Sequence, residues 1–284
     1  MGGGLLQLVA YGAQDVYLTG NPQITFFKVV YRRHTNFSIE SIQQTFNGNA
    51  QANNRVTCQI SRNGDLVHKL YVEFTPKDED IDDARECIKK VEVEIGGQLI
   101  DRQYGKWMKI WNELTLPSGK TAGYAKMVQD ANAKRYVPLE FWFCRNIGLA
   151  LPLIALQYHE VKINIEFEST GTVDGAELWA DYIFLDTDER RRFAQLSHEY
   201  LIEQVQFTGS ETVSSNSNLS AKLSFNHPVK ELIWEGQGNT GTAKLMLNGN
   251  DRFAEREAKY FSHVQPYQHH TNIPATGINS YSFA

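Results

Sequence analysis

Apolar and polar residues alternate one by one through much of the chain. Residues 91–95 read Val-Glu-Val-Glu-Ile, and residues 161–167 read Val-Lys-Ile-Asn-Ile-Glu-Phe. This period of two is typical of β-strands that have one face on a core and the other in water. Further strands are predicted in the same way at residues 37–46, 56–60, 66–74, 136–143, 178–185, 201–207, 219–225, 231–234 and 244–247. Because turns rich in Gly, Asn and Pro separate these runs, the pattern predicts a β-sandwich or a barrel.

Few segments place their apolar residues at the spacing of an α-helix. Residues 104–114 place Trp, Ile and Leu side chains on one helical face, and residues 186–193 open with acidic residues that favour a helical turn. Since the second helix separates two β-rich halves, we expect residues 187–198 to form a linker. Residues 1–36 hold three consecutive glycines and a basic, aromatic stretch at 26–33, which predicts an arm outside the first sandwich.

An internal repeat links the two halves. Three segments of the first half recur in the same order in the second, with Ile39 matching Ile202, Ile60 matching Leu223 and Ile95 matching Leu247. The three matched segments occur in the same order, and the members of each pair are separated by nearly the same number of residues. This predicts two copies of one β fold, over residues 37–186 and 199–284. The first copy continues to about Leu185, whereas little sequence follows Leu247, so we expect the second copy to lack its C-terminal strands.

Composition narrows the class of protein. The chain has 284 residues, of which 42% are apolar and 21% charged, a formal net charge of −5 and 3 cysteines. This balance excludes a disordered chain and argues against a protein whose main role is to neutralise phosphate. Cys58, Cys87 and Cys144 are too far apart for a zinc ribbon and too few for a disulfide scaffold.

Three segments partly match nucleotide- or metal-binding motifs, but the residues around them do not fit such sites. Residues 236–241 match the pattern GxGxxG, but a strand-like run follows where that fingerprint needs a helix, so we predict a hairpin loop. Residues 119–121 read Gly-Lys-Thr, without the glycine at position 114 that a Walker A loop requires. The acidic run at 77–83 lacks the spacing of an EF-hand and is predicted to be a solvated loop.

The remaining candidate residues also favour structural roles. His269 and His270 would point to opposite sides of an extended segment, and Cys144 has no neighbouring base, so we expect a polar loop and a buried thiol. No catalytic, cofactor-binding or metal site is therefore predicted, and no cofactor. Asn36 and Asn218 begin Asn-X-Ser sequons and are predicted glycosylation positions on the surface.

Longer words of the sequence carry a resemblance to a known family. Residues 8–28, 60–65, 148–161, 181–186, 193–204 and 249–253 closely resemble the major capsid proteins of nucleocytoplasmic large DNA viruses, in particular those of algal viruses. The resemblance extends over essentially the whole chain. The internal repeat is evidence that does not depend on this resemblance.

The resemblance implies an all-β tandem double jelly-roll, two antiparallel sandwiches side by side with few short helices. The domains would be an arm at 1–36, a first jelly-roll at 37–186, a linker at 187–198 and a second, incomplete jelly-roll at 199–284. It implies a homotrimeric, pseudo-hexagonal capsomer that contacts neighbouring capsomers in an icosahedral shell. The arm would contact minor capsid proteins and the inner membrane layer, without direct contact to nucleic acid.

The same resemblance places the protein in the virion, after assembly in the host cytoplasm, and implies no enzymatic activity. Two alternatives stay open at this point. One is a shortened capsid paralogue with a minor role in the shell. The other is a jelly-roll protein that binds glycans or attaches to a host, for which we would expect a monomer with an aromatic-rich pocket at one tip.

Overall fold

The computed structural model describes residues 36–77, 81–129, 133–169, 173–212, 218–236, 241–275 and 277–283. The chain divides into two compact units, residues 1–36 and residues 37–284. Apart from Asn36, the predicted N-terminal arm lies outside the described residues. The architecture below is that of the second unit.

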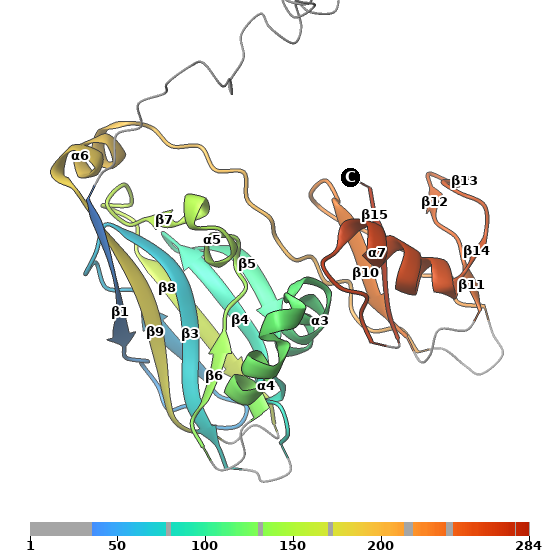
Figure 1. Ribbon diagram of the computed structural model, residues 1–284, viewed down its shortest axis with the longest axis horizontal. Helices are drawn as coiled ribbons and strands as arrows, with labels where there is room; N and C mark the ends of the chain where they lie inside the picture. The colour runs from blue at the N-terminus through green and yellow to red at the C-terminus, as the bar shows by residue number, and fades with distance from the viewer. Residues whose placement is uncertain are drawn as a thin grey trace, which may run out of the picture. The chain divides into compact units, whose positions relative to one another are not determined.

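Two antiparallel sheets form the first β-rich region (Figure 1). One sheet has the order β1-β9-β3-β6, with β7 paired to β3, and the other has the order β2-β8-β4-β5. The strands are β1 (Phe37–Gln44), β2 (Arg55–Gln59), β3 (Leu66–Pro76), β4 (Ile88–Ile95), β5 (Gln98–Tyr104), β6 (Arg135–Pro138), β7 (Leu151–Pro152), β8 (Val161–Phe167) and β9 (Val173–Leu185). First and last strands are neighbours in both sheets, which is the strand order of a jelly-roll.

Alternation in the sequence explains how the core forms. On β8, Val161, Ile163, Ile165 and Phe167 are buried between the sheets, whereas Lys162 and Glu166 on the opposite face are partly exposed. The ring of Phe167 meets that of Phe74 on β3 edge-on, with centroids 6.1 Å apart. The predicted all-β sandwich is therefore confirmed in this region.

Helices lie at the ends of strands rather than within the sheets (Figure 1). The helix predicted over 104–114 is α3, and the one predicted over 186–193 is α6; the side chain of Asp186 makes no capping hydrogen bond at its start. The helical elements here are η1 (Ala84–Cys87), α3 (Gly105–Thr115), η2 (Ser118–Lys120), α4 (Thr121–Gln129), α5 (Trp142–Arg145), η3 (Ile147–Leu149) and α6 (Thr187–Gln195).

The strand predicted over 136–143 is only partly correct. Strand β6 ends at Pro138, which has no N–H to donate to a neighbouring strand, and α5 follows at Trp142. Phe141, Trp142 and Phe143 are all buried. A run buried on every side does not alternate, so its periodicity could not distinguish a strand from a short helix.

The second β-rich region has shorter strands. Strand β10 (Glu231–Glu235) pairs with β15 (Ile278–Ser282), and two small hairpins and a helical segment lie between them in sequence. These elements are β11 (Thr242–Ala243), β12 (Met246–Leu247), β13 (Asn250–Asp251), β14 (Arg256–Glu257), a π-helix η4 (Tyr260–Val264) and α7 (Gln265–His269). Phe261 is buried among the rings of Trp234, Tyr260 and Phe253, with centroids 5.1 to 5.7 Å away.

Two segments predicted to be strands in this region are not strands in the structure. Residues 201–207 and 219–225 are all described and none is assigned to a strand, and the run predicted at 244–247 shortens to β12. No backbone–backbone hydrogen bond joins either segment to another described residue. The alternating pattern is present, but a strand needs a partner for its N–H and C=O groups.

Candidate assembly surfaces

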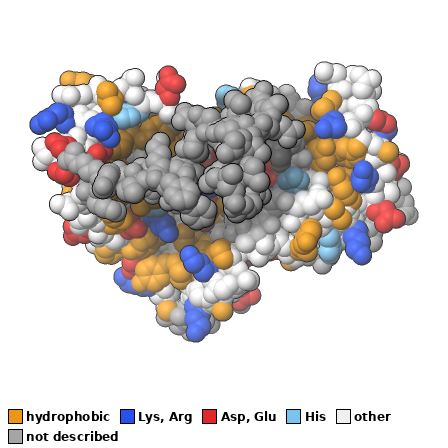
Figure 2. Space-filling view, turned by 45° about the horizontal axis from the view of Figure 1, so that its top comes forward, with side chains coloured by type: hydrophobic (Ala, Val, Ile, Leu, Met, Phe, Trp, Pro, Cys, Tyr) orange, Lys and Arg blue, Asp and Glu red, His pale blue; other side chains and the backbone are white. Residues whose placement is uncertain are grey.

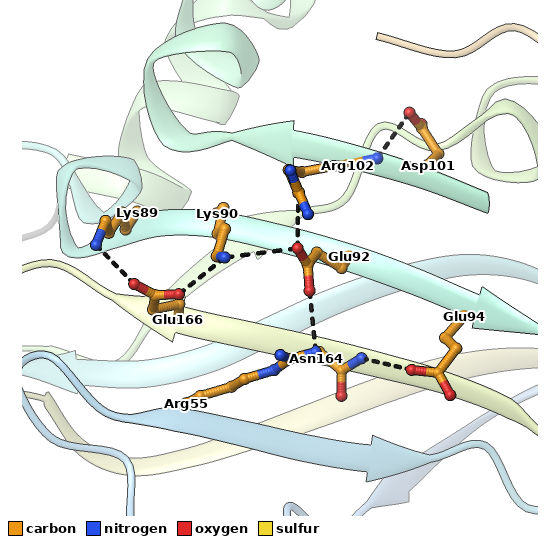
Figure 3. Close-up of polar contacts among 9 residues, drawn as sticks. All are labelled: Arg55, Lys89, Lys90, Glu92, Glu94, Asp101, Arg102, Asn164 and Glu166. Atoms are coloured by element: carbon orange, nitrogen blue, oxygen red, sulfur yellow. Dashed lines mark hydrogen bonds and ion pairs between the residues drawn. The ribbon is translucent and has the colours of Figure 1, made fainter. Parts of the chain in front are cut away.

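The outer face of the sheet β2-β8-β4-β5 carries a network of charged side chains (Figure 3). At its centre Glu92 on β4 accepts a hydrogen bond from Arg102 Nε at 2.6 Å and one from Arg55 Nη2 at 3.0 Å. Lys90 Nζ lies 3.6 Å from the same carboxylate. Three strands are thus tied together through one carboxylate.

A second carboxylate extends the network along β8. Glu166 accepts a hydrogen bond from Lys89 Nζ at 2.6 Å, and Lys90 Nζ lies 3.0 Å from its other oxygen. The hydrogen bonds from Lys89 and then Lys90 hold the pKa of Glu166 below its ordinary value. Lys90 joins the two carboxylates because it contacts both.

The network also contains a buried amide. Asn164 on β8 is only 3% exposed although it points to the polar face. Its Oδ1 accepts a hydrogen bond from Thr57 Oγ1 at 2.7 Å, and its Nδ2 donates to Glu94 at 3.4 Å. A buried amide that has partners costs little, so the face is both polar and well satisfied.

Burial differs between the two signs of charge on this face. The side chains of Arg55 and Lys89 are 51% and 50% exposed, whereas those of Glu92 and Glu166 are 5% and 21% exposed. The carboxylates are thus buried close to the strands, and the more exposed basic side chains cover them. Because each charge has a partner on the same face, another protein surface could cover it without burying an unpaired ion.

A second set of contacts joins the segment that follows α6 to β5 and to α5. Val205 N–H donates to Asp101 Oδ1 at 3.0 Å, Arg145 Nη1 lies 3.0 Å from Glu203 Oε2, and the rings of Tyr104 and Phe207 are 5.0 Å apart. Burial raises the pKa of Asp101, against the opposing effect of the hydrogen bonds that it accepts. The segment after α6 is thereby held at the edge of the first sandwich.

Both predicted glycosylation positions are exposed. Asn36 immediately precedes β1, and Asn218 immediately precedes the segment 219–225. Exposure is required for modification, and glycosylation at these two residues stays a prediction.

The cysteines and the histidine pair lie where structural roles would place them. Cys58, Cys87 and Cys144 are buried free thiols. Burial raises the pKa of Cys58 to about 12 and that of Cys144 still further, which makes both poor nucleophiles. The polar loop predicted for the histidine pair is wrong: His269 is the last residue of α7, and the His270 side chain that follows it is largely buried against Glu231. Within the described part of the chain, no group of three His, Cys, Asp or Glu residues could hold a metal ion.

The glycine loop lacks the context of a nucleotide site. Gly236 N–H donates to Gly277 O at 2.9 Å, and Gly241, with φ of +96°, leads into β11. Residues 241–257 are all described and contain no helix. The helix N-terminus that would bind a pyrophosphate is therefore missing at this loop, as the strand-like sequence indicates.

The acidic run is not uniformly solvated, which corrects the prediction for residues 77–83. Residues 78–80 lie outside the described ranges, but Asp83 is buried and caps η1 by accepting a hydrogen bond from Arg85 N–H at 3.0 Å. Its carboxylate also forms an ion pair with the Arg85 guanidinium. Burial acts to raise the pKa of Asp83, yet the hydrogen bonds and charge of Arg85 outweigh it and lower that pKa.

Figure 2 shows one face of the molecule. Where side chains are described on it, basic and acidic ones are interspersed with apolar ones. None of the helices in the described ranges is long and apolar enough to span a bilayer.

Comparisons with known proteins agree on one family. The family model described as "Major capsid protein N-terminus" matches residues 25–186, and that described as "Large eukaryotic DNA virus major capsid protein" matches residues 189–242 and 236–284. The major capsid protein of Pyramimonas orientalis virus is 56% identical over 315 residues, covering 98% of this chain and 78% of that protein. That of Paramecium bursaria Chlorella virus 1 is 45% identical over 357 residues, covering 100% and 82%.

Solved structures give the same result. A chain of the quasi-atomic model of the PBCV-1 virus capsid superposes with a TM-score of 0.81 at 41% identity, covering 92% of this chain and 81% of that one. The Faustovirus major capsid protein, at 11% identity and a TM-score of 0.68, shares the fold. These matches lead to one assignment. The chain belongs to the major capsid proteins of large eukaryotic DNA viruses, structural and non-enzymatic proteins that form the icosahedral shell of the virion.

Proposed function

We propose that this protein acts as a homotrimeric, pseudo-hexagonal capsomer that tiles the shell by contacts with neighbouring capsomers. The observation that carries the proposal is the likeness to the PBCV-1 capsid chain, which extends over 92% of this chain at 41% identity. The compensated charges on the sheet β2-β8-β4-β5 support it, because such a face can be covered by another subunit without leaving a buried ion unpaired.

Several finer features belong to the same proposal. The domains would be a first jelly-roll at 37–186, a linker at 187–198 and a second jelly-roll at 199–284, with assembly in the host cytoplasm. Residues 1–36 would contact minor capsid proteins and the membrane layer beneath the shell. Lys28, Arg32 and Arg33 are too few for strong binding to an acidic surface through charge alone, so this contact rests on the resemblance and on packing of the arm.

Native mass spectrometry of the purified protein tests the trimer. The expected mass is three times the 32.3 kDa of one chain. A trimer supports the capsomer, whereas a monomer that binds immobilised glycans would instead favour the alternative of an attachment protein. Quantitative mass spectrometry of virions separates a major from a minor shell role, because the major protein has the highest copy number.

A further inference from the structure

Two polar side chains lie on the core side of the edge strand β5. In the register between β4 and β5, Asp101 lies opposite Val93 and Gln103 lies opposite Val91. Both valines are buried in the first sandwich, and Asp101 and Gln103 are themselves only 3% and 1% exposed. Directly opposed residues of two strands point to the same face of a sheet. A carboxyl group is therefore buried where the alternation would place an apolar side chain.

The Asp101 carboxyl group accepts three hydrogen bonds. Val205 N–H donates to its Oδ1 at 3.0 Å. Arg102 N–H donates to the same oxygen at 2.9 Å (Figure 3), and Gln103 Nε2 donates to Oδ2 at 3.2 Å. The first donor belongs to the segment 201–207, whereas the other two belong to β5 itself. Asp101 therefore joins this segment to the first sandwich.

Few other contacts hold the segment 201–207. Ile202 packs against the core of the first sandwich, and Gln204 Nε2 donates a hydrogen bond to Ile100 O. One ion pair and one aromatic contact, described above, complete the attachment. No backbone–backbone hydrogen bond joins the segment to another described residue. A segment attached in this way can leave and return while the sandwich stays folded.

One guanidinium near Asp101 is shared among several carboxyl groups. Arg145 of α5 is the cation whose charge acts on Asp101, and it acts on the buried Glu140 as well. Its Nη1 also lies 3.0 Å from Glu203 Oε2 in the segment 201–207. Glu203 has a second partner, because Lys230 Nζ donates to its Oε1 at 2.5 Å. Asp101 thus has only part of one positive charge to balance its own.

The strands around Asp101 supply polar groups rather than a counter-charge. The guanidinium of Arg102 binds Glu92 on the outer face of the sheet, and Val93 on β4 is apolar. Gln103 Oε1 is buried and has no hydrogen-bond partner among the described residues. The cluster therefore contains more buried acceptors than donors. A proton on Asp101 would remove a charge and add a donor.

We propose that the contact between Asp101 and Val205 is an acid-strengthened clasp, which holds the segment 201–207 on the first sandwich more tightly when Asp101 is protonated than when it is ionised. The neutral carboxyl group keeps an oxygen that accepts the hydrogen bond from Val205 N–H. The ionised carboxylate loses hydration when the segment closes over it, so its charge favours the open segment, in which water reaches it. The proton is taken from solvent on closing and returned to solvent on opening.

Two carboxyl groups of this contact respond to pH in opposite directions. Burial raises the pKa of Asp101 above its ordinary value of 3.8, so the stabilisation by its proton is complete below that value and is lost as the pH rises through the raised pKa. The hydrogen bond from Lys230 lowers the pKa of Glu203, so its ion pairs are present above the ordinary value of 4.5 and are lost as the pH falls through the lowered pKa. The segment should be held most firmly in mild acid.

Hydrogen exchange at the Val205 amide, measured by NMR, tests the clasp. Its protection factor compares the observed rate with that of an unstructured peptide at the same pH. This factor should rise about fivefold between about pH 7.5 and about pH 5. The amides of β8, at the centre of its sheet, should show no such rise and serve as the internal reference. Native mass spectrometry at each pH records whether the oligomeric state changes.

Matched variants separate the charge of Asp101 from its hydrogen bond. Asp101→Asn keeps an acceptor without a charge, so protection of the Val205 amide should be high and nearly independent of pH. Asp101→Ala removes the acceptor and should lower that protection about tenfold in mild acid. Glu140→Gln removes the neighbouring buried carboxyl group and should keep the pH dependence of the parent protein. Glu203→Gln should remove only the loss of protection in stronger acid. Unchanged exchange in β8 shows that each variant is folded.

Four results would overturn the proposal: protection at Val205 that stays constant or falls in mild acid, a rise that persists in Asp101→Asn, a rise that disappears in Glu140→Gln, or a rise that follows a change of mass instead. The last result would assign the protection to contacts between subunits. The clasp lies within one chain, so its absence would not contradict the trimer. A protein that stays monomeric would likewise leave the clasp standing.

Discussion

The two β-rich regions of this chain share a sequence pattern but differ in how it is used. In the first region every long alternating run pairs with at least one other strand. The apolar faces of β2 and β8 are buried there, although Phe37 and Ile39 on β1 are 63% and 47% exposed. In the second region the runs at 201–207 and 219–225 have the alternation without the neighbours. The difference teaches that alternation specifies which face of a segment is apolar, whereas pairing decides whether the segment becomes a strand.

The largest expected difference between the regions concerns ion pairs. Arg85→Ala leaves Asp83 charged and buried in the first region, which should lower the free energy of unfolding by about 3–5 kcal/mol. Lys244→Ala removes the exposed partner of Asp251 in the second region and should cost at most about 0.5 kcal/mol. Urea denaturation monitored by circular dichroism measures both, and similar losses would contradict the contrast in burial.

An intermediate difference is expected from deleting one methyl group. Ile163→Val opens a small cavity between the sheets and should lower the free energy of unfolding by about 0.5–1.5 kcal/mol. Leu223→Val alters a side chain that is 43% exposed and should stay within about 0.5 kcal/mol of the parent protein. If the second variant lost as much as the first, residue 223 would already be packed in solution.

The smallest effect concerns the exposed charges of the sheet face. Lys89→Ala removes one partner of Glu166 and should lower the free energy of unfolding only slightly, and less at high salt. Because the pKa of Glu166 is lowered in the folded protein, its contribution is present above the unfolded value of about 4.3 and is lost as the pH falls through the folded pKa.

Stability measured between pH 6 and pH 2.5 checks the sign of that effect. The parent protein should lose more stability than Lys89→Ala over this interval, since the variant has less of the interaction to lose. Equal slopes would mean that Lys89 does not stabilise the ionised form of Glu166. The same pH series on Asp251→Asn measures how much an exposed carboxylate of the second region contributes, for comparison with Glu166.

The sequence predicted the first sandwich well because its strands are long and half-buried. Residues 161–167 alternate without a break and became β8. Failures followed from contacts that no local pattern contains. Phe141, Trp142 and Phe143 are all buried, so they do not alternate, and residues 201–207 alternate without a strand partner among the described residues.

The sheet face shows the same limit. Alternation correctly placed Glu92 and Asn164 opposite the core, but it could not show that both residues are buried. They are buried by Arg55, Arg102 and Thr57 from strands whose order the sequence does not state. In the sequence, the Lys and Glu residues at outward positions indicated a charged face. Which of them contact one another depends on the register between the strands, which the sequence does not give.

Gly105 shows how a single close approach escapes prediction. A Cβ atom at this position would lie 2.1 Å from Arg85 O and 2.3 Å from Ile88 O, so only glycine fits where α3 begins. The apolar spacing of the residues after it predicted the helix correctly. Nothing in that spacing identified the backbone of η1 as its neighbour.

The position of β9 has a consequence for synthesis. This strand is the last of the first sandwich, yet it lies between β1 and β3 at the centre of its sheet. A ribosome must therefore release the chain beyond Leu185 before the first sheet can close, and until then β1 and β3 expose apolar faces and unpaired edges. Folding of this region is expected to occur in one late step, with the nascent chain depending on chaperones until that step.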